Sequence, residues 1–188
     1  MASILLPLAT GFEEVEAVSL IDVLRRGGIE VRIAHLDGLV TSDLVLGANG
    51  IIIKADTSVA HVRTEDFDMI LLPGGWDGTY ALAENRTVQR LLKEFQASNK
   101  IIGSICAAAF ALKVAGVLGN NYTCYPAAKE EVDHEGYRDD QAVVTDGNIM
   151  TSQGPGTALC FGLEIVKRFS GEETYQAVKE GMLLEFCK

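Results

Sequence analysis

The sequence predicts an α/β fold in which a mostly parallel sheet is covered by helices on both faces. Apolar runs alternate with segments of helical periodicity from end to end, and the candidate strands are apolar at almost every position. Such continuous apolar strands are typical of parallel sheets, which are buried on both sides. With 188 residues, 48% of them hydrophobic, the chain has the size and the apolar content of one domain. We therefore expect a single domain over residues 1–188.

The first half of the chain opens with a strand and a capped helix. Ser3 to Ala9 predicts the strand, and Glu13 to Arg26 predicts the helix, with Thr10 and Glu13 spaced as a capping box and Gly27-Gly28 as a stop. The segments that follow are strands at Ile29 to Leu36 and Phe67 to Leu72, one or two short strands within Leu44 to Ile53, and an amphipathic helix at Arg86 to Ser98.

The second half repeats the alternation. Lys100 to Ile105 predicts an apolar strand, Ala107 to Ala115 a helix, and a short strand ends at Tyr125. Lys129 to Gln141 is polar and rich in charge, so we expect a solvated excursion. The remaining elements are a hairpin of Ala142 to Thr145 with Ile149 to Ser152, and helices at Thr157 to Phe169 and Glu173 to Phe186.

Composition excludes several classes of function. The formal net charge is -10 and no run of Lys or Arg is present, which argues against nucleic acid and against an anionic membrane surface as partners. The apolar N-terminus lacks a basic region, so we interpret it as a strand and expect a cytoplasmic protein with no membrane segment. The four cysteines form no CxxC pair, and we expect four reduced thiols.

Four loops are expected to meet at one edge of the sheet, because sites in such folds gather at the carboxyl ends of the strands. They are Ala9 to Glu16, Leu72 to Gly78, Ser104 to Ala108 and Ser152 to Thr157.

Cys106 occupies a strand-to-helix junction among small residues, the setting of a nucleophile elbow. A sulfur at a helix N-terminus has its thiolate stabilised and its pKa lowered. The alternative is a small buried hydrophobe, the common state of a free cysteine. Taken by itself, Cys106 favours neither interpretation.

Two glycine turns flank the cysteine. The N–H groups of Gly74-Gly75, together with that of Ala107, can form an oxyanion hole, although a glycine pair more often marks a tight turn. Gly154 opens a helix in a similar way, but the third glycine of a dinucleotide fingerprint is missing and no P-loop is present. The three histidines fit no metal motif. We therefore expect neither a cofactor nor a metal.

Glu16 is the carboxylate most suited to act on the cysteine. On a helical wheel it falls between Leu20 and Val23, so it borders the buried side of the first helix. Burial there raises the pKa of a carboxyl, which can then stay protonated and donate to a sulfur. The alternative is a first-turn glutamate that interacts with the helix dipole. The glycine turns and Glu16 together shift the balance toward a reactive Cys106.

Together these segments resemble the ThiJ/PfpI superfamily over nearly the whole chain. The likeness is closest to the branch that holds the Parkinson-disease-associated protein deglycase and its bacterial relatives. It rests on Gly11-Phe12-Glu13-Glu14-Val15-Glu16, Asp22-Val23-Leu24-Arg25-Arg26, Leu72-Pro73-Gly74-Gly75, Ile105-Cys106-Ala107 and Thr151-Ser152-Gln153-Gly154-Pro155-Gly156-Thr157.

The resemblance implies a flavodoxin-like three-layer sandwich and a homodimer. It implies a reactive Cys106, a protonated Glu16 hydrogen-bonded to its sulfur, and an oxyanion pocket at Gly75 and Ala107. The implied activity is that of a glyoxalase or protein deglycase acting on methylglyoxal or its early adducts. The alternative is a redox-sensing holdase chaperone whose cysteine becomes a sulfinate, and a less favoured one is a role in thiazole monophosphate biosynthesis.

Two positions depart from patterns within the superfamily. Its intracellular proteases carry histidine directly after the cysteine, where this chain has Ala107, which disfavours proteolysis. The deglycase branch often has histidine where this chain has Tyr125. Histidine exchanges a proton near neutral pH and tyrosine does not do so readily, which leaves Glu16 as the expected acid and base.

Overall fold

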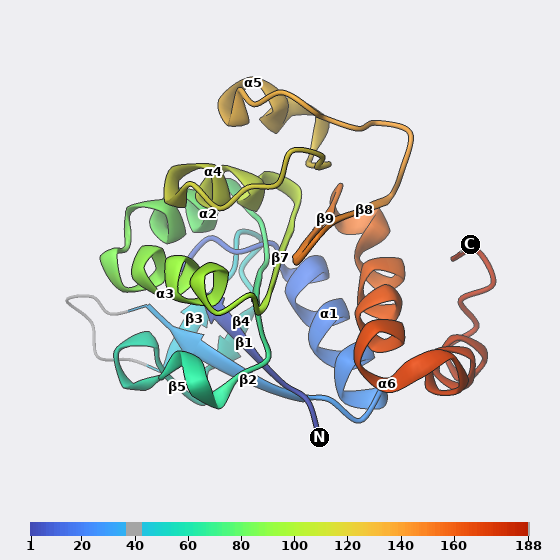
Figure 1. The fold of residues 1–188 in the computed structure, drawn as a ribbon. Coiled ribbons are helices and arrows are strands. Elements are labelled where there is room, and N and C mark those ends of the chain that lie inside the picture. Colours follow the sequence, from blue (N-terminus) through green and yellow to red (C-terminus); the bar gives the residue numbers. More distant parts are fainter. Residues whose placement is uncertain (37–42, 188) are drawn as a thin grey trace.

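The computed structural model describes residues 1–36 and 43–187, and it contains a seven-stranded sheet between two layers of helices (Figure 1). The strand order is β5-β2-β1-β6-β7-β9-β8, and only β8 runs antiparallel to its neighbour. This arrangement confirms the predicted flavodoxin-like sandwich. The strands are β1 (Ser3–Leu8), β2 (Glu30–His35), β5 (Thr57–Ser58), β6 (Met69–Leu72), β7 (Ile101–Ile105), β8 (Val143–Asp146) and β9 (Ile149–Ser152). A separate antiparallel hairpin pairs β3 (Leu44–Leu46) with β4 (Ile52–Lys54).

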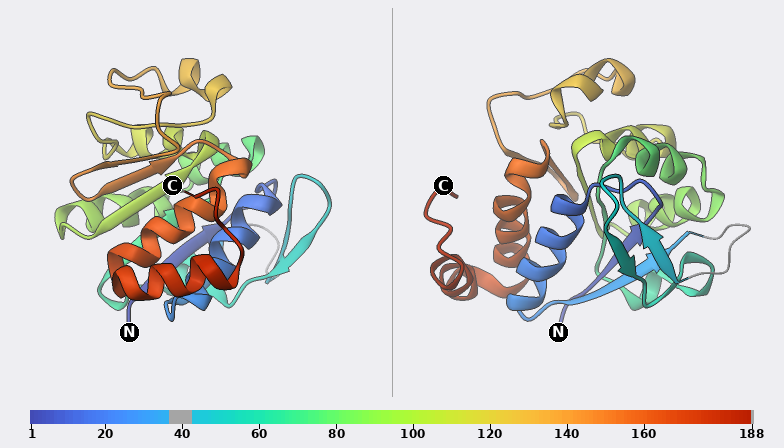
Figure 2. Two further views of the ribbon diagram at one scale, coloured as in Figure 1. Left: turned by 90° about the vertical axis from the view of Figure 1, so that its right-hand side faces the viewer. Right: turned by 180° about the vertical axis from the view of Figure 1, so that it is seen from behind.

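Helices cover both faces of the sheet (Figure 2). The buried apolar residues form two separate clusters. One layer holds α1 (Glu14–Arg26) and α6 (Ala158–Gly181), and Phe161 lies at its centre. The other holds α2 (Trp76–Glu84), α3 (Arg86–Ala97) and α4 (Ala109–Ala115), with Phe95 fully buried. Among residues 1–36 and 43–187, no helix combines the length and the apolar character that a membrane-spanning segment needs.

Strand register brings the predicted loops to one edge. Ile4 pairs with Met69, Leu72 with Ser104, and Ile105 with Ser152, all in parallel strands. The ends of β1, β6, β7 and β9 therefore point the same way, which confirms the expected convergence. The excursion over Lys129 to Gln141 is mostly exposed, and it contains the short helix α5 (Lys129–Val132).

Several local predictions were wrong. Thr10 and Glu13 do not form the predicted capping box. The chain turns at Gly11, with φ +84°, and Glu13 is itself the N-cap of α1, where its side chain accepts from the Val15 N–H. The strand expected to end at Tyr125 is absent, since Tyr122 makes only an isolated bridge with Tyr137. Helix α2 was not predicted at all; its nine residues follow two glycines and include Gly78, which obscures their periodicity.

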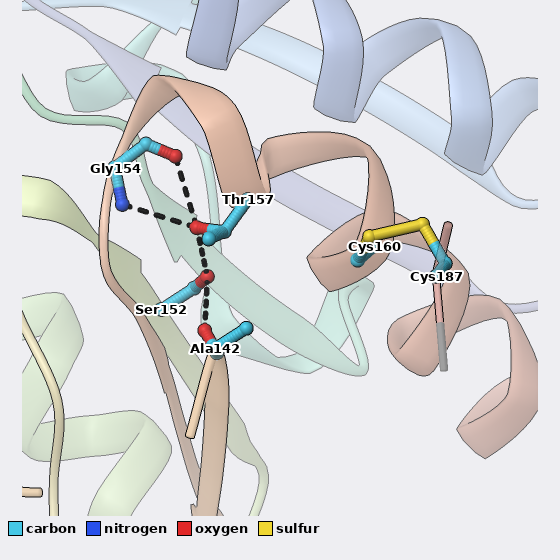
Figure 3. The surroundings of a disulfide bond; sticks show 6 residues. All are labelled: Ala142, Ser152, Gly154, Thr157, Cys160 and Cys187. Atoms are coloured by element: carbon cyan, nitrogen blue, oxygen red, sulfur yellow. Dashed lines mark hydrogen bonds between the residues drawn. A yellow bond between two sulfur atoms is a disulfide. The ribbon is translucent and has the colours of Figure 1, made fainter. Parts of the chain in front are cut away.

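The C-terminal segment reverses direction and is held by a disulfide bond. Gly171, with φ +83°, interrupts α6, and the helix ends at Gly181 instead of continuing to Phe186 as expected. The reversal places Cys187 beside Cys160, 27 residues earlier, with their Cα atoms 5.2 Å apart (Figure 3). The expectation of four reduced thiols was therefore wrong, because the kink in α6 at Gly171 brings Cys160 and Cys187 together. Cys106 and Cys124 are free.

Candidate active site

Cys106 lies in a strained turn between β7 and α4. It begins a 3₁₀ turn over Cys106–Ala108 and has φ +62°, a left-handed conformation that non-glycine residues seldom adopt. The side chain is 9% exposed. Residues held in this way cluster at functional sites, where the surrounding fold fixes them. The geometry matches the elbow that the small neighbouring residues predicted.

Gly74 allows the loop after β6 to approach the cysteine. A Cβ at this position would lie 2.6 Å from the Cys106 Cβ and 2.8 Å from Glu16 Oε2, distances that no side chain can accept. Gly75 has φ +91°, and its Cβ would meet the Gly11 carbonyl oxygen at 2.3 Å. Both positions therefore require glycine, for close approach and for conformation.

The backbone N–H groups of Gly75 and Ala107 are directed at the Cys106 sulfur. Each forms a hydrogen bond that lowers the pKa of the thiol. Gly75 is the N-cap of α2, and Ala107 lies in the turn that leads into α4. The sulfur thus faces two N–H donors at the start of two helical elements. They are the groups named in the sequence for an oxyanion hole, and that role stays a prediction.

Glu16 is fully buried in the first turn of α1, which confirms the position read from the helical wheel. Its Oε2 accepts a hydrogen bond of 2.8 Å from the Gly74 N–H, while Oε1 has no hydrogen-bond partner. Burial raises the pKa of Glu16 to about 7, although the bond from Gly74 and the contact with Cys106 lower it in part. A carboxyl with this pKa exchanges its proton near neutrality, and an unpartnered Oε1 suits the protonated oxygen.

The Cys106 thiol does not have the lowered pKa that its position predicted. Burial, the charge of Glu16 and a hydrogen bond to that carboxylate together raise the pKa of Cys106 to about 12, because they outweigh the two N–H donors that lower it.

Cys106 and Glu16 consequently titrate as a pair. Glu16 loses its proton near pH 7, whereas the Cys106 thiol keeps its own to about pH 12. Transfer of the thiol proton to the Glu16 carboxylate then leaves a thiolate that faces the N–H groups of Gly75 and Ala107. The pair therefore supplies a nucleophile and an acid at once, without a histidine.

Tyr125 reaches the rim of this site. Its backbone N–H donates to the Cys106 carbonyl oxygen at 3.2 Å, and its side chain is 41% exposed. The ring lies beside Gly154, where a Cβ would stand 3.3 Å from Tyr125 Cδ2.

The histidines belong to other parts of the fold. His35 ends β2, where its Nδ1 contacts the Leu36 carbonyl oxygen. His61 ends the 3₁₀ turn Val59–His61, which follows the edge strand β5. The ring of His134 packs on Tyr122 in the excursion. Within residues 1–36 and 43–187, no three His, Cys, Asp or Glu side chains gather as metal ligands.

The Gly154 turn is closed on itself. The Gly154 N–H donates to Thr157 Oγ1 at 3.1 Å, and the Thr157 N–H donates to the Gly154 carbonyl at 2.9 Å. Thr157 Oγ1 also lies 2.7 Å from Ser152 Oγ (Figure 3). Because these groups bind one another, the turn gives no support to the phosphate site that a thiazole monophosphate substrate requires.

Glu14 is a structural residue that the sequence did not reveal. Its carboxylate is 3% exposed and accepts hydrogen bonds from the N–H and side chain of Asn49 and from the Ile51 N–H. Burial raises its pKa, but these bonds outweigh that effect and the pKa is lowered overall. Glu14 thereby ties the β3–β4 hairpin to the start of α1, and only the folded hairpin shows this.

The fold and the site together define a class of protein: flavodoxin-like proteins in which a cysteine in a strand-to-helix turn contacts a buried carboxyl group. Residues 2–168 match the DJ-1/PfpI family, and the chain belongs to that family. Protein dj-1beta of Drosophila melanogaster is 41% identical over 98% of both chains, and its crystal structure superimposes with a TM-score of 0.91 over 97% of each chain.

Two further relatives carry informative names. The glutathione-independent glyoxalase DJR-1.2 of Caenorhabditis elegans is 36% identical over 97% of this chain and 96% of its own. The structure of oxidized Toxoplasma gondii DJ-1 is 31% identical and matches with a TM-score of 0.88, covering 97% of this chain and 98% of the other.

Proposed function

We propose that this protein is a cysteine-dependent glyoxalase or deglycase that acts on methylglyoxal or its early adducts. The observation that carries the proposal is the pairing of Cys106 with a buried Glu16 whose pKa is about 7, opposite two N–H donors. The glyoxalase name of the Caenorhabditis elegans relative supports the same reaction class.

In the proposed mechanism, the Cys106 thiolate attacks the aldehyde carbon and forms a C–S bond. The carbonyl electrons move to oxygen, where the N–H groups of Gly75 and Ala107 stabilise the alkoxide until Glu16 protonates it. The Glu16 carboxylate then removes the proton from the former aldehyde carbon, which gives an enediol, and returns it to the neighbouring carbon. The hydroxyl proton moves to the neighbouring oxygen at the same time, which leaves a thioester. Water hydrolyses the thioester to lactate and restores the thiolate.

Conversion of methylglyoxal to lactate tests this proposal. We expect Cys106→Ala and Glu16→Gln to abolish turnover, because one removes the nucleophile and the other the proton carrier. Cys124→Ala is the matched control, since Cys124 is also a free, buried cysteine. Equal rates for the wild type and Cys106→Ala, in protein free of other glyoxalases, would refute the mechanism.

A redox-sensing role with little turnover is the second candidate. The donors that favour an alkoxide also suit the oxygens of a cysteine sulfinate, with Glu16 as a third donor. We expect mild peroxide to add two oxygens to Cys106 before Cys124 reacts, as measured by mass spectrometry of intact and digested protein. Equal oxidation of both thiols would count against this role.

We also propose a homodimer that buries the apolar surface formed by α1 and the β3–β4 hairpin. Val15 and Val18 of α1 are 53% and 47% exposed, and Ile52 of the hairpin is 57% exposed. Light scattering should give twice the chain mass for the wild type and the monomer mass for Val18→Glu. Val114→Glu is the control, because Val114 is similarly exposed on α4.

A further inference from the structure

The Cys160–Cys187 disulfide lies in the wall of a groove on the surface, far along the sheet from β1. The groove has a volume of about 530 Å³. Its lining includes Val143 and Thr145 of β8, Cys160 of α6, and Phe186 with Cys187 at the end of the chain. Cys160 is only partly buried. Because both cysteines line this groove, a small thiol in solution can reach the bond between them.

The bond joins the beginning of α6 to the end of the chain. Cys160 is in the first turn of the helix, and Gly171 interrupts the helix about halfway along. The chain then runs back beside the first half of α6, as the trace toward the C-terminus shows (Figure 1). The disulfide therefore closes a loop that contains both halves of α6.

Residues 185–187 have few attachments besides the disulfide. The Leu184 N–H donates to the Lys179 carbonyl oxygen at 2.9 Å, which closes the end of α6, and the Cys187 N–H donates to the Leu184 carbonyl oxygen at 3.0 Å. In the part of the chain that the structure describes, no hydrogen bond joins residues 185–187 to a residue before Leu184. Phe186 is 60% exposed, and the packing of the Cys187 side chain, 2% exposed, accompanies the bond itself.

We propose that the Cys160–Cys187 disulfide is a thiol-exchange site that controls the attachment of residues 185–187. A disulfide that solvent thiols can reach takes its redox state from the balance of thiols and disulfides around it. Oxidation holds residues 185–187 against α6, and reduction releases them.

The exchange consumes two molecules of a small thiol such as glutathione. The first, as a thiolate, attacks the Cys160 sulfur and forms a mixed disulfide, the Cys160–Cys187 bond breaks, and Cys187 leaves as a thiolate that takes a proton from water. The second thiolate attacks the sulfur that the first one contributed, which gives the oxidised form of the small thiol and leaves Cys160 to take up a proton. One protein disulfide is reduced and two small thiols are oxidised.

Release changes the surface next to the edge strand β8. Phe186 and Cys187 form one wall of the groove, so the groove exists in the oxidised protein and loses that wall on reduction. Strand β8 is the last in the order of the sheet, and Val143 lies on the opposite side of the groove. The redox state thus determines whether this part of β8 is covered.

Mixtures of reduced and oxidised glutathione test the exchange in the folded protein. After acid quenching, alkylation and digestion, mass spectrometry measures the fraction of Cys160–Cys187 disulfide, while Trp76 fluorescence reports that the fold is intact. We expect the disulfide to be complete in oxidised glutathione and absent in reduced glutathione. A bond that is reduced only in urea, or a pair that stays reduced in oxidised glutathione, would overturn the proposal.

The variant Cys187→Ser tests the point of attack. It leaves Cys160 as a free, partly buried thiol, and oxidised glutathione should add to it in the folded protein. Cys124 is the control in the same molecule, because it is a free cysteine that is fully buried, and it should stay unmodified. Modification of both cysteines, or of neither, would contradict attack at Cys160.

Amide hydrogen exchange measures the release. The amide at position 187, which donates to the Leu184 carbonyl oxygen, should be protected in the oxidised wild type and lose that protection on reduction. Cys187→Ser should lack the protection in both buffers, and Cys124→Ala should behave as the wild type. Protection that survives reduction would show that residues 185–187 stay in place and would overturn the release.

Cys106 takes no part in this exchange, so Cys106→Ala should give the same glutathione titration and the same protection as the wild type. A titration that depends on Cys106 would assign the exchange to the active-site cysteine and overturn the proposal. Loss of methylglyoxal conversion in the same variant concerns only the proposed function.

Discussion

Glu16 should destabilise the folded protein at neutral pH, and replacing it with glutamine should remove that effect. The side chain is fully buried, and its pKa rises from 4.5 to about 7, chiefly through burial. A glutamine fills the same space, and its amide oxygen can accept the bond from the Gly74 N–H that Glu16 Oε2 accepts now. The substitution therefore removes the charge while preserving the packing.

The sign follows from where the proton binds more tightly. The folded state holds the Glu16 proton up to about pH 7, whereas the unfolded chain loses it near pH 4.5. Below pH 4.5 both states are protonated and the folded protein has its full stability. As pH rises through the window from 4.5 to 7, that stability is progressively lost, and above pH 7 the deficit stays constant. The shift corresponds to about 3 kcal/mol in all, of which about 2.5 kcal/mol falls between pH 5 and pH 8.

Urea unfolding at pH 5, 6, 7 and 8, followed by Trp76 fluorescence, measures this difference. The free energy of unfolding of Glu16→Gln, minus that of the wild type, should grow by about 2.5 kcal/mol from pH 5 to pH 8. Titrating groups that Glu16 does not contact are common to both proteins and cancel. Cys124→Ala, which removes a buried thiol whose pKa burial raises to about 11, should run parallel to the wild type over this range. Parallel pH profiles for Glu16→Gln and the wild type would refute the buried-acid reasoning.

Three further outcomes follow from the same geometry. Iodoacetamide labelling of Cys106, measured by mass spectrometry, should rise near pH 7, because Glu16 ionises there and can take the thiol proton. Cys124, whose pKa burial raises to about 11, should stay unlabelled below pH 9. Labelling of Cys106 only above pH 9 would contradict the role of Glu16 as its base. Gly75→Ala should lower the free energy of unfolding in urea by about 2 kcal/mol or more, because φ is +91° and the new Cβ would clash with the Gly11 carbonyl oxygen. Gly28→Ala is the control: φ is +73°, but no atom lies within 4 Å of the new Cβ, so the loss should be about 1 kcal/mol. Cys187→Ser should lower the free energy of unfolding by about 3.5 kcal/mol, because it opens the 27-residue loop that the disulfide closes. A reductant should destabilise the wild type and leave the variant unchanged. A wild type whose stability does not respond to reductant would contradict this.

The features that the sequence predicted well depend on local pattern and on the parallel sheet. Apolar runs at β1, β6 and β7 identify buried strands, and once these are parallel their ends must share an edge. Glu16 could be placed because its neighbours Leu20 and Val23 define the buried side of one regular helix. The small residues around Cys106 indicated a tight turn, and the left-handed φ of +62° is what that turn required.

The features that it missed depend on contacts between distant segments. The disulfide forms because the chain reverses direction where α6 is interrupted at Gly171. The sequence predicts separate helices on either side of this point, but a glycine between them does not indicate a reversal of direction. The Cys106 pKa was expected to fall because the helix N-terminus was the only field visible in the sequence. Burial of the sulfur and the charge of Glu16 act in the opposite direction, and both arise from tertiary packing.

This chain has Ala107 where the intracellular proteases of the superfamily have histidine, and the surroundings of the Cys106 sulfur differ accordingly. With alanine after Cys106, the sulfur has no adjacent imidazole, and the one carboxyl that contacts it is the group left to exchange its proton. A solvated glutamate would be ionised at neutral pH and could not donate, but burial moves the pKa of Glu16 to about 7, where donation and acceptance are balanced. The desolvation that destabilises the folded state is therefore the same effect that lets a carboxyl serve a cysteine at physiological pH. It also explains why Oε1 stays without a polar partner: a second N–H donor there would hold Glu16 ionised and remove its proton from the reaction.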